Sequence, residues 1–333
     1  MIRVGIVGLG RMGSGMALNV AKAGFPLSMY DAEEGRVQDL KETWVKDKHL
    51  SEGPGGLSTP HLHEQESPAD VMLASDVCLV CVHTEKQTID ALVGEDGLLA
   101  VGPKGMSDKI VVDHGTVSPR FSKKMAEAVA KGGGSFLDAP ISGGPQGAQE
   151  GSLSIMVGGK EEHVETCMPV FEAMGSRIEH MGPWGSGAAA KLVNQHLVIT
   201  NTVAACEAYV LARSLGLRDT NKLKGLLAES WGHSRMLDYV LADLLKVEEA
   251  GDDVEALRRS LAPVRTLAKD AAIVTRAAHE GGASAMLMQF AQAQIDDTVK
   301  QGFSDCSFAS VATAIKARGT RGSTSGSGSD EAQ

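Results

Sequence analysis

The pattern of apolar and polar residues divides the chain into two parts. In the first, short apolar runs alternate with helical stretches such as Pro119–Lys131 and Glu161–Met174. This alternation is typical of a doubly wound α/β domain, whose parallel sheet is covered on both faces by helices. The candidate strands are Val4–Val7, Leu27–Tyr30, Val77–Val82, Ile110–Asp113, Ser135–Asp138, Leu153–Val157 and Arg177–His180.

The pattern changes after a glycine-rich segment that ends at Gly187. Residues from Ala188 to Leu215 contain neither proline nor glycine and repeat with a helical period, which predicts one long helix. The following sequence contains further helical segments and no convincing strand. We therefore expect a dinucleotide-binding Rossmann domain over 1–182, an all-helical substrate and oligomerisation domain over 183–318, and a disordered Gly/Ser-rich tail over 319–333.

A glycine motif follows the first apolar run directly. Gly8, Gly10 and Gly13 have the spacing G-x-G-x-x-G, and a helix is predicted from Met12 to Lys22. A strand that leads into such a turn brings a pyrophosphate close to the backbone and to the free N–H groups of a helix start. The alternative is a glycine-rich turn without a ligand. The candidate phosphate-binding residues are Gly8, Leu9, Gly10, Arg11, Met12 and Gly13.

An acidic residue stands where this motif requires one. Asp31 ends the second apolar run, at the position from which a carboxylate accepts hydrogen bonds from the hydroxyls of an adenosine ribose. The residues that follow it, including Glu33 and Glu34, add negative charge that repels a 2′-phosphate. The sequence therefore favours NAD over NADP, with Arg36 as the one nearby basic residue.

Composition narrows the function classes further. The chain has 333 residues, 43% of them hydrophobic, and a formal net charge of −10, which argues against nucleic-acid binding. It shows no leader and no long apolar segment, so we expect a cytoplasmic protein without membrane contact. Five cysteines without a disulfide pattern suit a reducing compartment. Cys78 and Cys81 have C-x-x-C spacing, but they lie in an apolar run that reads as a buried strand, and we expect no metal site.

Residues at the ends of the predicted strands are candidates by position. Ligands of doubly wound sheets bind beyond the carboxyl ends of the strands, so Val82-His83-Thr84 and His114-Gly115-Thr116 are expected to line the cofactor cleft. Asp138–Gly151 is a strand that runs into a loop with four glycines. Ser142, Gly143 and Gly144 would present a hydroxyl and N–H groups to a carboxylate; a tight structural turn is the alternative.

The long helix carries a polar stripe that contains few charges. Its members recur at spacings of three, four and seven residues, which brings them to roughly one side of the helix. A solvated helix edge would explain them, as would a substrate site. These residues are Lys191, Asn194, Gln195, Asn201 and Thr202.

Four motifs together resemble the β-hydroxyacid dehydrogenases, the family of 3-hydroxyisobutyrate dehydrogenase and tartronate semialdehyde reductase. They are the N-terminal glycine motif, the Asp138–Gly151 segment, the helix start Gly185–Gln195 and the pair Lys269-Asp270. The resemblance implies hydride transfer between NAD(H) and a short β-hydroxy acid or its semialdehyde. It also implies that Lys191 is the catalytic acid/base.

The same resemblance implies further site residues. Asn194 would hold the substrate beside Lys191, Lys269 would close on the nicotinamide side, and the cofactor contacts would include Val82, His83, Gln87 and Thr116. The chain departs from the family pattern at His83, where an apolar-proline pair is common, at Gly115, and in an apparent insertion over 51–62.

Three further expectations complete the sequence-based picture. The alternatives to a β-hydroxyacid dehydrogenase are a decarboxylating enzyme of the 6-phosphogluconate dehydrogenase type and a nucleotide-binding protein without catalysis. We expect a homo-oligomer, a dimer or a tetramer, because the helical part has many apolar faces. The side-chain pocket for the substrate is not identified by the sequence; its candidates are Trp231, His233 and Met236.

Overall fold

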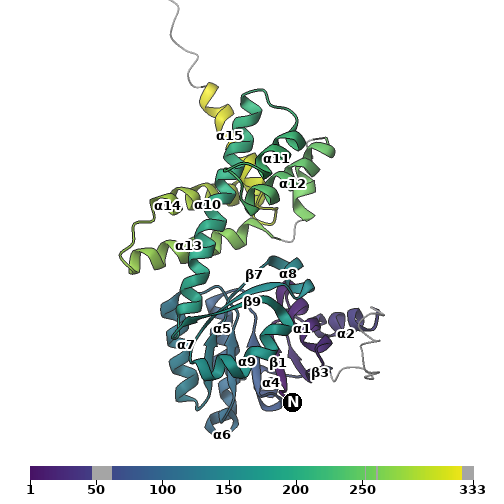
Figure 1. Cartoon of the computed structure of the whole chain (residues 1–333), viewed down its shortest axis with the longest axis vertical. Helices are drawn as coiled ribbons and strands as arrows, with labels where there is room; N and C mark the ends of the chain where they lie inside the picture. Colours follow the sequence, from purple (N-terminus) through teal and green to yellow (C-terminus); the bar gives the residue numbers. More distant parts are fainter. Residues whose placement is uncertain (47–61, 252, 260–261, 325–333) are drawn as a thin grey trace, which may run out of the picture. The chain divides into compact units, whose positions relative to one another are not determined.

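The computed structural model describes residues 1–46, 62–251, 253–259 and 262–324 (Figure 1). The chain divides into two compact units, Met1–Leu192 and Val193–Gln333. This division falls after the boundary expected at residue 182, because the first turn of the long helix α10 (Ser186–Ser214) packs against strands of the first unit.

The first unit contains a nine-stranded sheet of order β3-β2-β1-β4-β5-β6-β8-β7, with β9 also paired to β8. Every pairing from β3 through to β6 is parallel, which confirms the doubly wound expectation. The strands are β1 (Val4–Val7), β2 (Leu27–Tyr30), β3 (Leu62–Glu64), β4 (Val77–Val80), β5 (Ile110–Asp113), β6 (Ser135–Asp138), β7 (Ile141–Ser142), β8 (Leu153–Gly158) and β9 (Gly175–Gly182).

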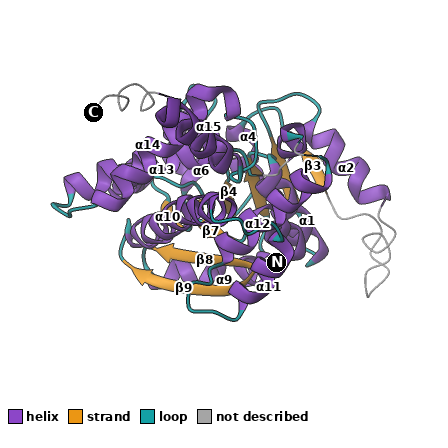
Figure 2. Cartoon of the chain, turned by 90° about the horizontal axis from the view of Figure 1, so that it is seen from above, coloured by secondary structure: helices purple, strands orange, loops and turns teal. Residues whose placement is uncertain are grey.

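The sheet is mixed at one end, which the sequence did not indicate. Strand β8 runs antiparallel to both β6 and β7. Strand β9 runs parallel to β8, and the two arrows lie side by side in Figure 2. Only β7 and a seven-residue helix connect β6 to β8. A parallel pairing requires a longer crossover, so the chain direction reverses here.

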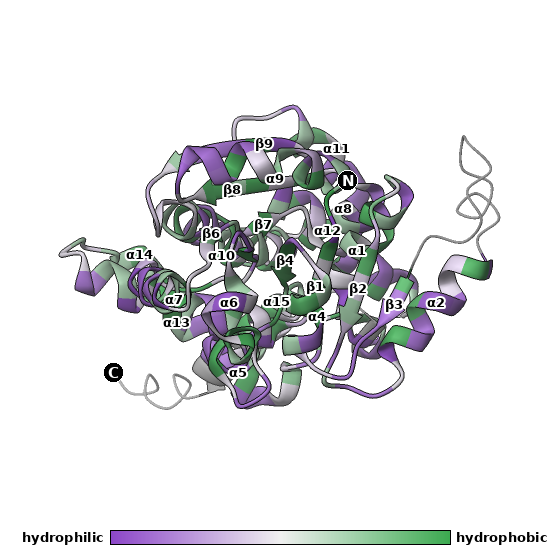
Figure 3. Cartoon of the chain, turned by 90° about the horizontal axis from the view of Figure 1, so that it is seen from below, coloured by the Kyte–Doolittle hydropathy of each residue, from purple (hydrophilic) through white to green (hydrophobic). Residues whose placement is uncertain are grey.

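Helices cover both faces of the sheet, and alternate side chains of the strands supply the two cores. Ile6 of β1 packs with Met16 and Val20 on one face, and Val7 packs with Met125 on the other. The central strands β1 and β4 are accordingly hydrophobic in Figure 3. The α-helices are α1 (Arg11–Lys22), α2 (Arg36–Lys46), α4 (Pro68–Ala74), α5 (Glu85–Val93), α6 (Gly102–Met106), α7 (Pro119–Lys131), α8 (Gly144–Glu150) and α9 (Glu161–Met174).

Strand β3 was missed by the sequence reading, whose candidate strands pass directly from Leu27–Tyr30 to Val77–Val82. His63 lies within β3 and pairs in register with Ser28 of β2. Positions 51–61 of the apparent insertion, His61 among them, lie outside the described residues. A three-residue edge strand buries too little for an apolar pattern to reveal it.

The secondary structure of the second unit consists of helices, with no named strand among its described residues, as expected. Its last helix, α15 (Ser310–Thr324), extends into the expected tail, so residues 319–324 are helical and 325–333 lie outside the description. No helix of the described ranges combines the length and the apolar character needed to cross a bilayer. Besides α10 and α15, the unit contains α11 (Thr220–Ala228), α12 (Arg235–Glu249), η2 (Val254–Arg259), α13 (Val264–Glu280), α14 (Met286–Thr298) and η3 (Val299–Phe303).

Candidate functional site

The glycine motif lies at the carboxyl edge of the parallel sheet. Gly8 directly follows β1, with a positive φ of 97°. A Cβ atom there would stand 2.4 Å from the carbonyl oxygen of Cys81, and one on Gly13 would stand 1.9 Å from the carbonyl oxygen of Gly8. Gly8 and Gly13 are therefore required by the turn itself and by the packing of α1 against it.

Gly10 is different, because the protein itself does not require it. Its φ is −63°, which any residue adopts, and an added Cβ would meet no atom closer than Arg36 Nη1 at 3.8 Å. Gly10 precedes α1, whose first turn is capped by no side chain and contains no acidic residue. The space beside Gly10 thus fits a ligand that approaches the backbone closely and carries negative charge, as a pyrophosphate does. The residues present fit a dinucleotide.

Asp31 is held in place by two backbone N–H groups, one within the glycine motif and one just after Asp31 itself. Its Oδ2 accepts a hydrogen bond from the Leu9 N–H at 2.5 Å, and its Oδ1 accepts one from the Glu33 N–H at 2.8 Å. The side chain of Arg36 forms an ion pair with Glu33 and lies 3.8 Å from Asp31 Oδ1. A carboxylate oxygen can accept more than one hydrogen bond, so Asp31 retains capacity for ribose hydroxyls. Because Arg36 already pairs with these carboxylates, it is less available to bind a 2′-phosphate.

The other expected cofactor contacts follow β4 and β5. Val82 and Thr116 are partly buried, whereas His83 and Gln87 are exposed. The side-chain oxygen of Gln87 accepts hydrogen bonds from the N–H groups of His83, at 3.0 Å, and Thr84, at 3.1 Å, which completes a capping box at the start of α5. Gln87 thus shapes this turn, and its contact with a cofactor stays a prediction, as do those of Val82, His83 and Thr116.

His114 is buried at the end of β5. Its Nδ1 lies 2.6 Å from the carbonyl oxygen of Ala139, so this nitrogen carries the proton. Burial lowers the pKa of His114 to about 4. The ring meets Phe171 edge-on. His114 therefore joins the end of β5 to the segment that leads to Ser142, as a neutral side chain at physiological pH.

The candidate carboxylate-binding segment is ordered by β7 and α8, which the sequence reading took for a loop. Ser142 pairs with Ser154 of β8, and the next two residues have positive φ values, 140° at Gly143 and 66° at Gly144. A Cβ on Gly144 would meet nothing within 4 Å, so backbone conformation explains this glycine. Ser142 is partly buried, and Gly143 and Gly144 are exposed.

Helix α10 is anchored on the sheet at its start. Asp138, at the end of β6, accepts hydrogen bonds from the N–H groups of Gly185 and Ala188, both at 2.8 Å. A Cβ on Gly187 would stand 2.2 Å from the carbonyl oxygen of Met156, so only glycine fits against β8 here. Lys191 is four residues further on and therefore lies on the same side of the helix. It is 7% exposed.

In the second unit, buried Asp270 of α13 organises the two remaining candidates. Its carboxylate accepts a hydrogen bond from Gln195 Nε2 and forms an ion pair with Lys269 Nζ at 2.9 Å. Gln195 Oε1 in turn accepts a hydrogen bond from Asn194 Nδ2 at 3.0 Å. Within this unit the structure therefore connects Lys269 to Asn194, and it gives Gln195 a buried partner rather than a place on a solvated helix edge.

Three residues were suggested by the sequence for a substrate pocket, and this role stays a prediction. Trp231 is fully exposed, and His233 Nε2 pairs with Asp238 at 2.7 Å. Met236 is half-buried on the first turn of α12.

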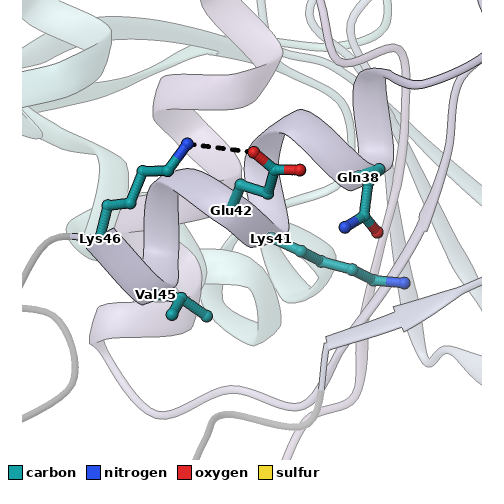
Figure 4. A pocket seen from close by; sticks show the side chains of 5 residues that line it. All are labelled: Gln38, Lys41, Glu42, Val45 and Lys46. Carbon is teal, nitrogen blue, oxygen red and sulfur yellow. Dashed lines mark hydrogen bonds and ion pairs between the residues drawn. The ribbon is translucent and has the colours of Figure 1, made fainter.

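The five cysteines are free, and burial raises the pKa values of Cys81, Cys167 and Cys206 to about 12. Among the described residues, no three His, Cys, Asp or Glu side chains are grouped to hold a metal ion. The described residues that line a surface hollow along α2, from Gln38 to Lys46, all belong to this one helix (Figure 4).

Comparison with known proteins identifies relatives of both units. The family model of the NAD-binding domain of 6-phosphogluconate dehydrogenase matches residues 3–182. The model described as the NAD-binding domain of NADP-dependent 3-hydroxyisobutyrate dehydrogenase matches residues 185–315. Together the two models span nearly the whole described chain.

Curated relatives include several dehydrogenases and reductases. A 2-hydroxy-3-oxopropionate reductase of Escherichia coli is 35% identical over 237 residues, which cover 71% of this chain and 74% of the relative. The mitochondrial 3-hydroxyisobutyrate dehydrogenase of Homo sapiens is 34% identical over 69% of this chain and 62% of its own length. An NAD-dependent L-serine dehydrogenase of Pseudomonas aeruginosa is 29% identical over 93% of this chain and 97% of the relative.

Solved structures show the same fold. A 3-hydroxyisobutyrate dehydrogenase from Salmonella typhimurium has a TM-score of 0.76 at 23% identity and covers 94% of this chain and 99% of its own. A Mycobacterium tuberculosis 3-hydroxyisobutyrate dehydrogenase with L-serine has the same TM-score and identity over 95% of this chain and 99% of its own.

Proposed function

The chain belongs to the β-hydroxyacid dehydrogenase family, an oxidoreductase family with NAD-binding domains, and from this premise we propose that it oxidises a short β-hydroxy acid or reduces its semialdehyde. The single observation on which this proposal depends is the free space beside Gly10, close to Asp31, whose carboxylate is oriented by the N–H group of Leu9. When bound, NAD⁺ accepts the hydride from the carbon that bears the alcohol.

We assign the proton transfer to Lys191. Its ammonium group donates a proton to the oxygen in the direction of reduction, and the neutral amine accepts the hydroxyl proton in the direction of oxidation. The near-complete burial of Lys191 supports this role, because it keeps the amine away from bulk water. Lys191 also shares one side of α10 with Gly187, which packs against the end of the sheet. This position supports a site at the carboxyl edge of the sheet, where the glycine motif lies.

We assign carboxylate binding to Ser142, Gly143 and Gly144. The hydroxyl and the backbone N–H groups of this segment are donors, and the positive φ values at both glycines bring successive N–H groups to one side. A carboxylate held there fixes which carbon of the acid faces the cofactor. Asn194 would bind the substrate through its amide, and Lys269 would act on the nicotinamide side.

The relatives indicate a small substrate. Their names refer to 2-hydroxy-3-oxopropionate, 3-hydroxyisobutyrate and L-serine, which share a short acid and a β-oxygen. The orientation of Asp31 supports NAD as the cofactor, with NADP as the weaker alternative.

A panel assay tests the proposal. NADH formation would be followed by fluorescence with NAD⁺ and 3-hydroxyisobutyrate, L-serine, D-glycerate or 6-phosphogluconate, and the reverse reaction with the semialdehydes. We expect turnover with at least one short β-hydroxy acid. Turnover with 6-phosphogluconate and CO₂ release would instead indicate the decarboxylating class. NADH binding without turnover on any acid would indicate a nucleotide-binding protein.

We also propose that the chain forms a homo-oligomer and functions in the cytoplasm. Large apolar side chains of the second unit are exposed on α14, where Met286, Leu287 and Phe290 are each more than 60% accessible. The free cysteines are compatible with a reducing compartment. Light scattering after size exclusion would measure the oligomer, and a monomeric mass at micromolar concentration would contradict it.

A further inference from the structure

Helices α1 and α8 are interlocked through two residues of α1, although α8 lies more than 120 residues later in the chain. On Gly15, an added Cβ would stand 2.8 Å from the carbonyl oxygen of Ala148 and 2.9 Å from the backbone nitrogen of Gln149. The helices therefore touch backbone to backbone at this position. Only glycine allows this approach.

Asn19, one turn further along α1, makes the polar contacts of the same interface. Its Nδ2 donates to the carbonyl oxygens of Ala148 at 2.7 Å and Gln149 at 3.2 Å, and to that of Gly15 in its own helix at 3.0 Å. Asn19 is 8% exposed and Ala148 is fully buried. The contact is thus a desolvated hydrogen bond between two helices rather than a solvated surface contact.

The carbonyl groups that Asn19 binds are those that α8 leaves unsatisfied. The last carbonyl groups of a helix have no N–H partner within it. In α8 the carbonyl oxygen of Gly147 accepts hydrogen bonds from the N–H groups of Gly151 and Ser152. The carbonyl oxygens of Ala148 and Gln149 accept hydrogen bonds from Asn19 Nδ2 instead. Asn19 therefore caps the end of α8 from another helix.

A helix of seven residues depends on such external contacts for its position. Isolated helices of this length are unstable in water. Apart from α1, α8 rests on Leu153 of β8, whose side chain would lie 3.1 Å from a Cβ on Gly143 and 3.4 Å from one on Gly147. Any displacement of α8 also displaces Gly144, which is its first residue, and the adjoining Gly143.

We propose that Asn19 is a positioning residue for the substrate segment: through its contact with the end of α8, the cofactor-binding helix sets the position of Ser142–Gly144. This inference rests on the proposed carboxylate-binding role of that segment. It assigns a function to a side chain that touches neither ligand. Gly15 contributes to the same positioning, because its lack of a side chain lets the backbones of α1 and α8 come into contact.

The first test requires no substrate. Amide hydrogen exchange would compare the wild-type protein with Asn19→Leu and Gly15→Ala. We expect peptides that cover residues 144–152 to exchange at least tenfold faster in both variants, whereas peptides of α7 keep their wild-type rates. Unchanged exchange of α8 in both variants would overturn the proposal, whatever the enzyme's substrate.

The second test separates positioning from loss of stability. Val20→Ala is the matched control, because Val20 is fully buried in the same helix but packs in the core of the sheet. With the acid identified by the panel assay, Asn19→Leu and Gly15→Ala should raise KM for the acid about tenfold. The Kd of NADH should change less than twofold, and kcat less than threefold. Val20→Ala should lower Tm without changing KM.

Two results of the second test would overturn the proposal. One is an equal increase of KM in Val20→Ala, which would attribute the effect to general destabilisation. The other is a weaker binding of NADH with an unchanged KM for the acid, which would place the role of Asn19 on the cofactor side. A wild-type protein without activity on any acid would instead refute the proposed function, and the exchange result would still stand.

Discussion

At the scale of single residues, the structure distinguishes glycines that serve the fold from one that serves a ligand. Gly8 and Gly13 are confined by neighbouring backbone oxygen atoms, whereas the neighbourhood of Gly10 is open. The glycine motif therefore contains positions that differ in their tolerance of substitution. The difference can be measured because stability and binding respond separately.

We expect Gly10→Ala to retain the wild-type free energy of unfolding to within about 0.5 kcal/mol, since its backbone conformation and surroundings accept a methyl group. The same variant should weaken NADH binding at least about tenfold, because the methyl group occupies the space of the pyrophosphate. Gly13→Ala should instead lose stability. Urea unfolding and NADH titration would check both; unimpaired NADH binding by Gly10→Ala would contradict the assignment of the phosphate site.

Lys191 carries the proposed proton transfer. We expect Lys191→Ala to bind NADH normally and to lose at least about a hundredfold in kcat, which is the usual contribution of general acid–base catalysis. Lys86→Ala, which removes an exposed lysine of α5, is the control. Near-normal turnover of Lys191→Ala in steady-state assays would remove Lys191 from the mechanism.

His114 makes the stability of the fold depend on pH. Because burial lowers its pKa from 6.5 to about 4, the unfolded chain takes up a proton at higher pH than the folded protein does. The stability contribution is fully present above pH 6.5 and decreases as the pH falls toward 4. The total is on the order of 3 kcal/mol.

Urea unfolding at pH 7 and pH 5 would measure this effect. The wild-type protein should lose about 2 kcal/mol more between these two pH values than His114→Asn, whose side chain does not titrate. Equal losses in the two proteins would show that other groups determine the acid sensitivity.

At the scale of elements, the first unit was largely predictable because its strands are apolar runs and its helices begin with recognisable caps. Helices α7 and α9 have the predicted bounds. Ser118 and Thr84 cap α7 and α5 through their side chains, as their residue types favour. Local sequence therefore determined these element boundaries.

What the sequence did not indicate depends on contacts between distant residues. Strand β3 exists because β2 offers a pairing edge, and β7 exists because β8 folds back beside it. The buried partners Asn19, Asp138 and Asp270 carry no local signal of their own, because each is defined by groups far along the chain. A polar residue in a predicted apolar helix face, such as Asn19, was the available hint.

The attachment of α10 gives a prediction at this scale. Asp138→Ala removes an ionisable acceptor from two buried N–H groups, so we expect a loss of about 3 kcal/mol in stability and a fall in kcat, since the same helix presents Lys191. Asp138→Asn retains one oxygen and should lose less. Asp90→Ala, at an exposed ion pair, should lose under about 1 kcal/mol. Thermal and urea unfolding would rank the three variants, and an equal stability of Asp138→Ala and Asp90→Ala would contradict the capping role.

At the scale of the whole molecule, bound cofactor and global stability are coupled. NADH at about 100 times its Kd should stabilise the folded state by about 2.7 kcal/mol. Cys78 and Cys167 are buried on opposite faces of the sheet, so their thiols react only when the first unit opens. Their labelling by a thiol reagent, followed by mass spectrometry, should slow about a hundredfold with NADH. Labelling at an unchanged rate would show that the cofactor does not bind this unit.

The backbone contact between Gly15 and Ala148 has a consequence for protein engineering. A chimera that imports the N-terminal strand and helix of a relative, in order to exchange the cofactor preference, also imports a new surface for α8. Such grafts should recover substrate affinity only when residues 143–152 are transplanted from the same donor. Recombination libraries of this family should accordingly treat the two segments as a single inherited block.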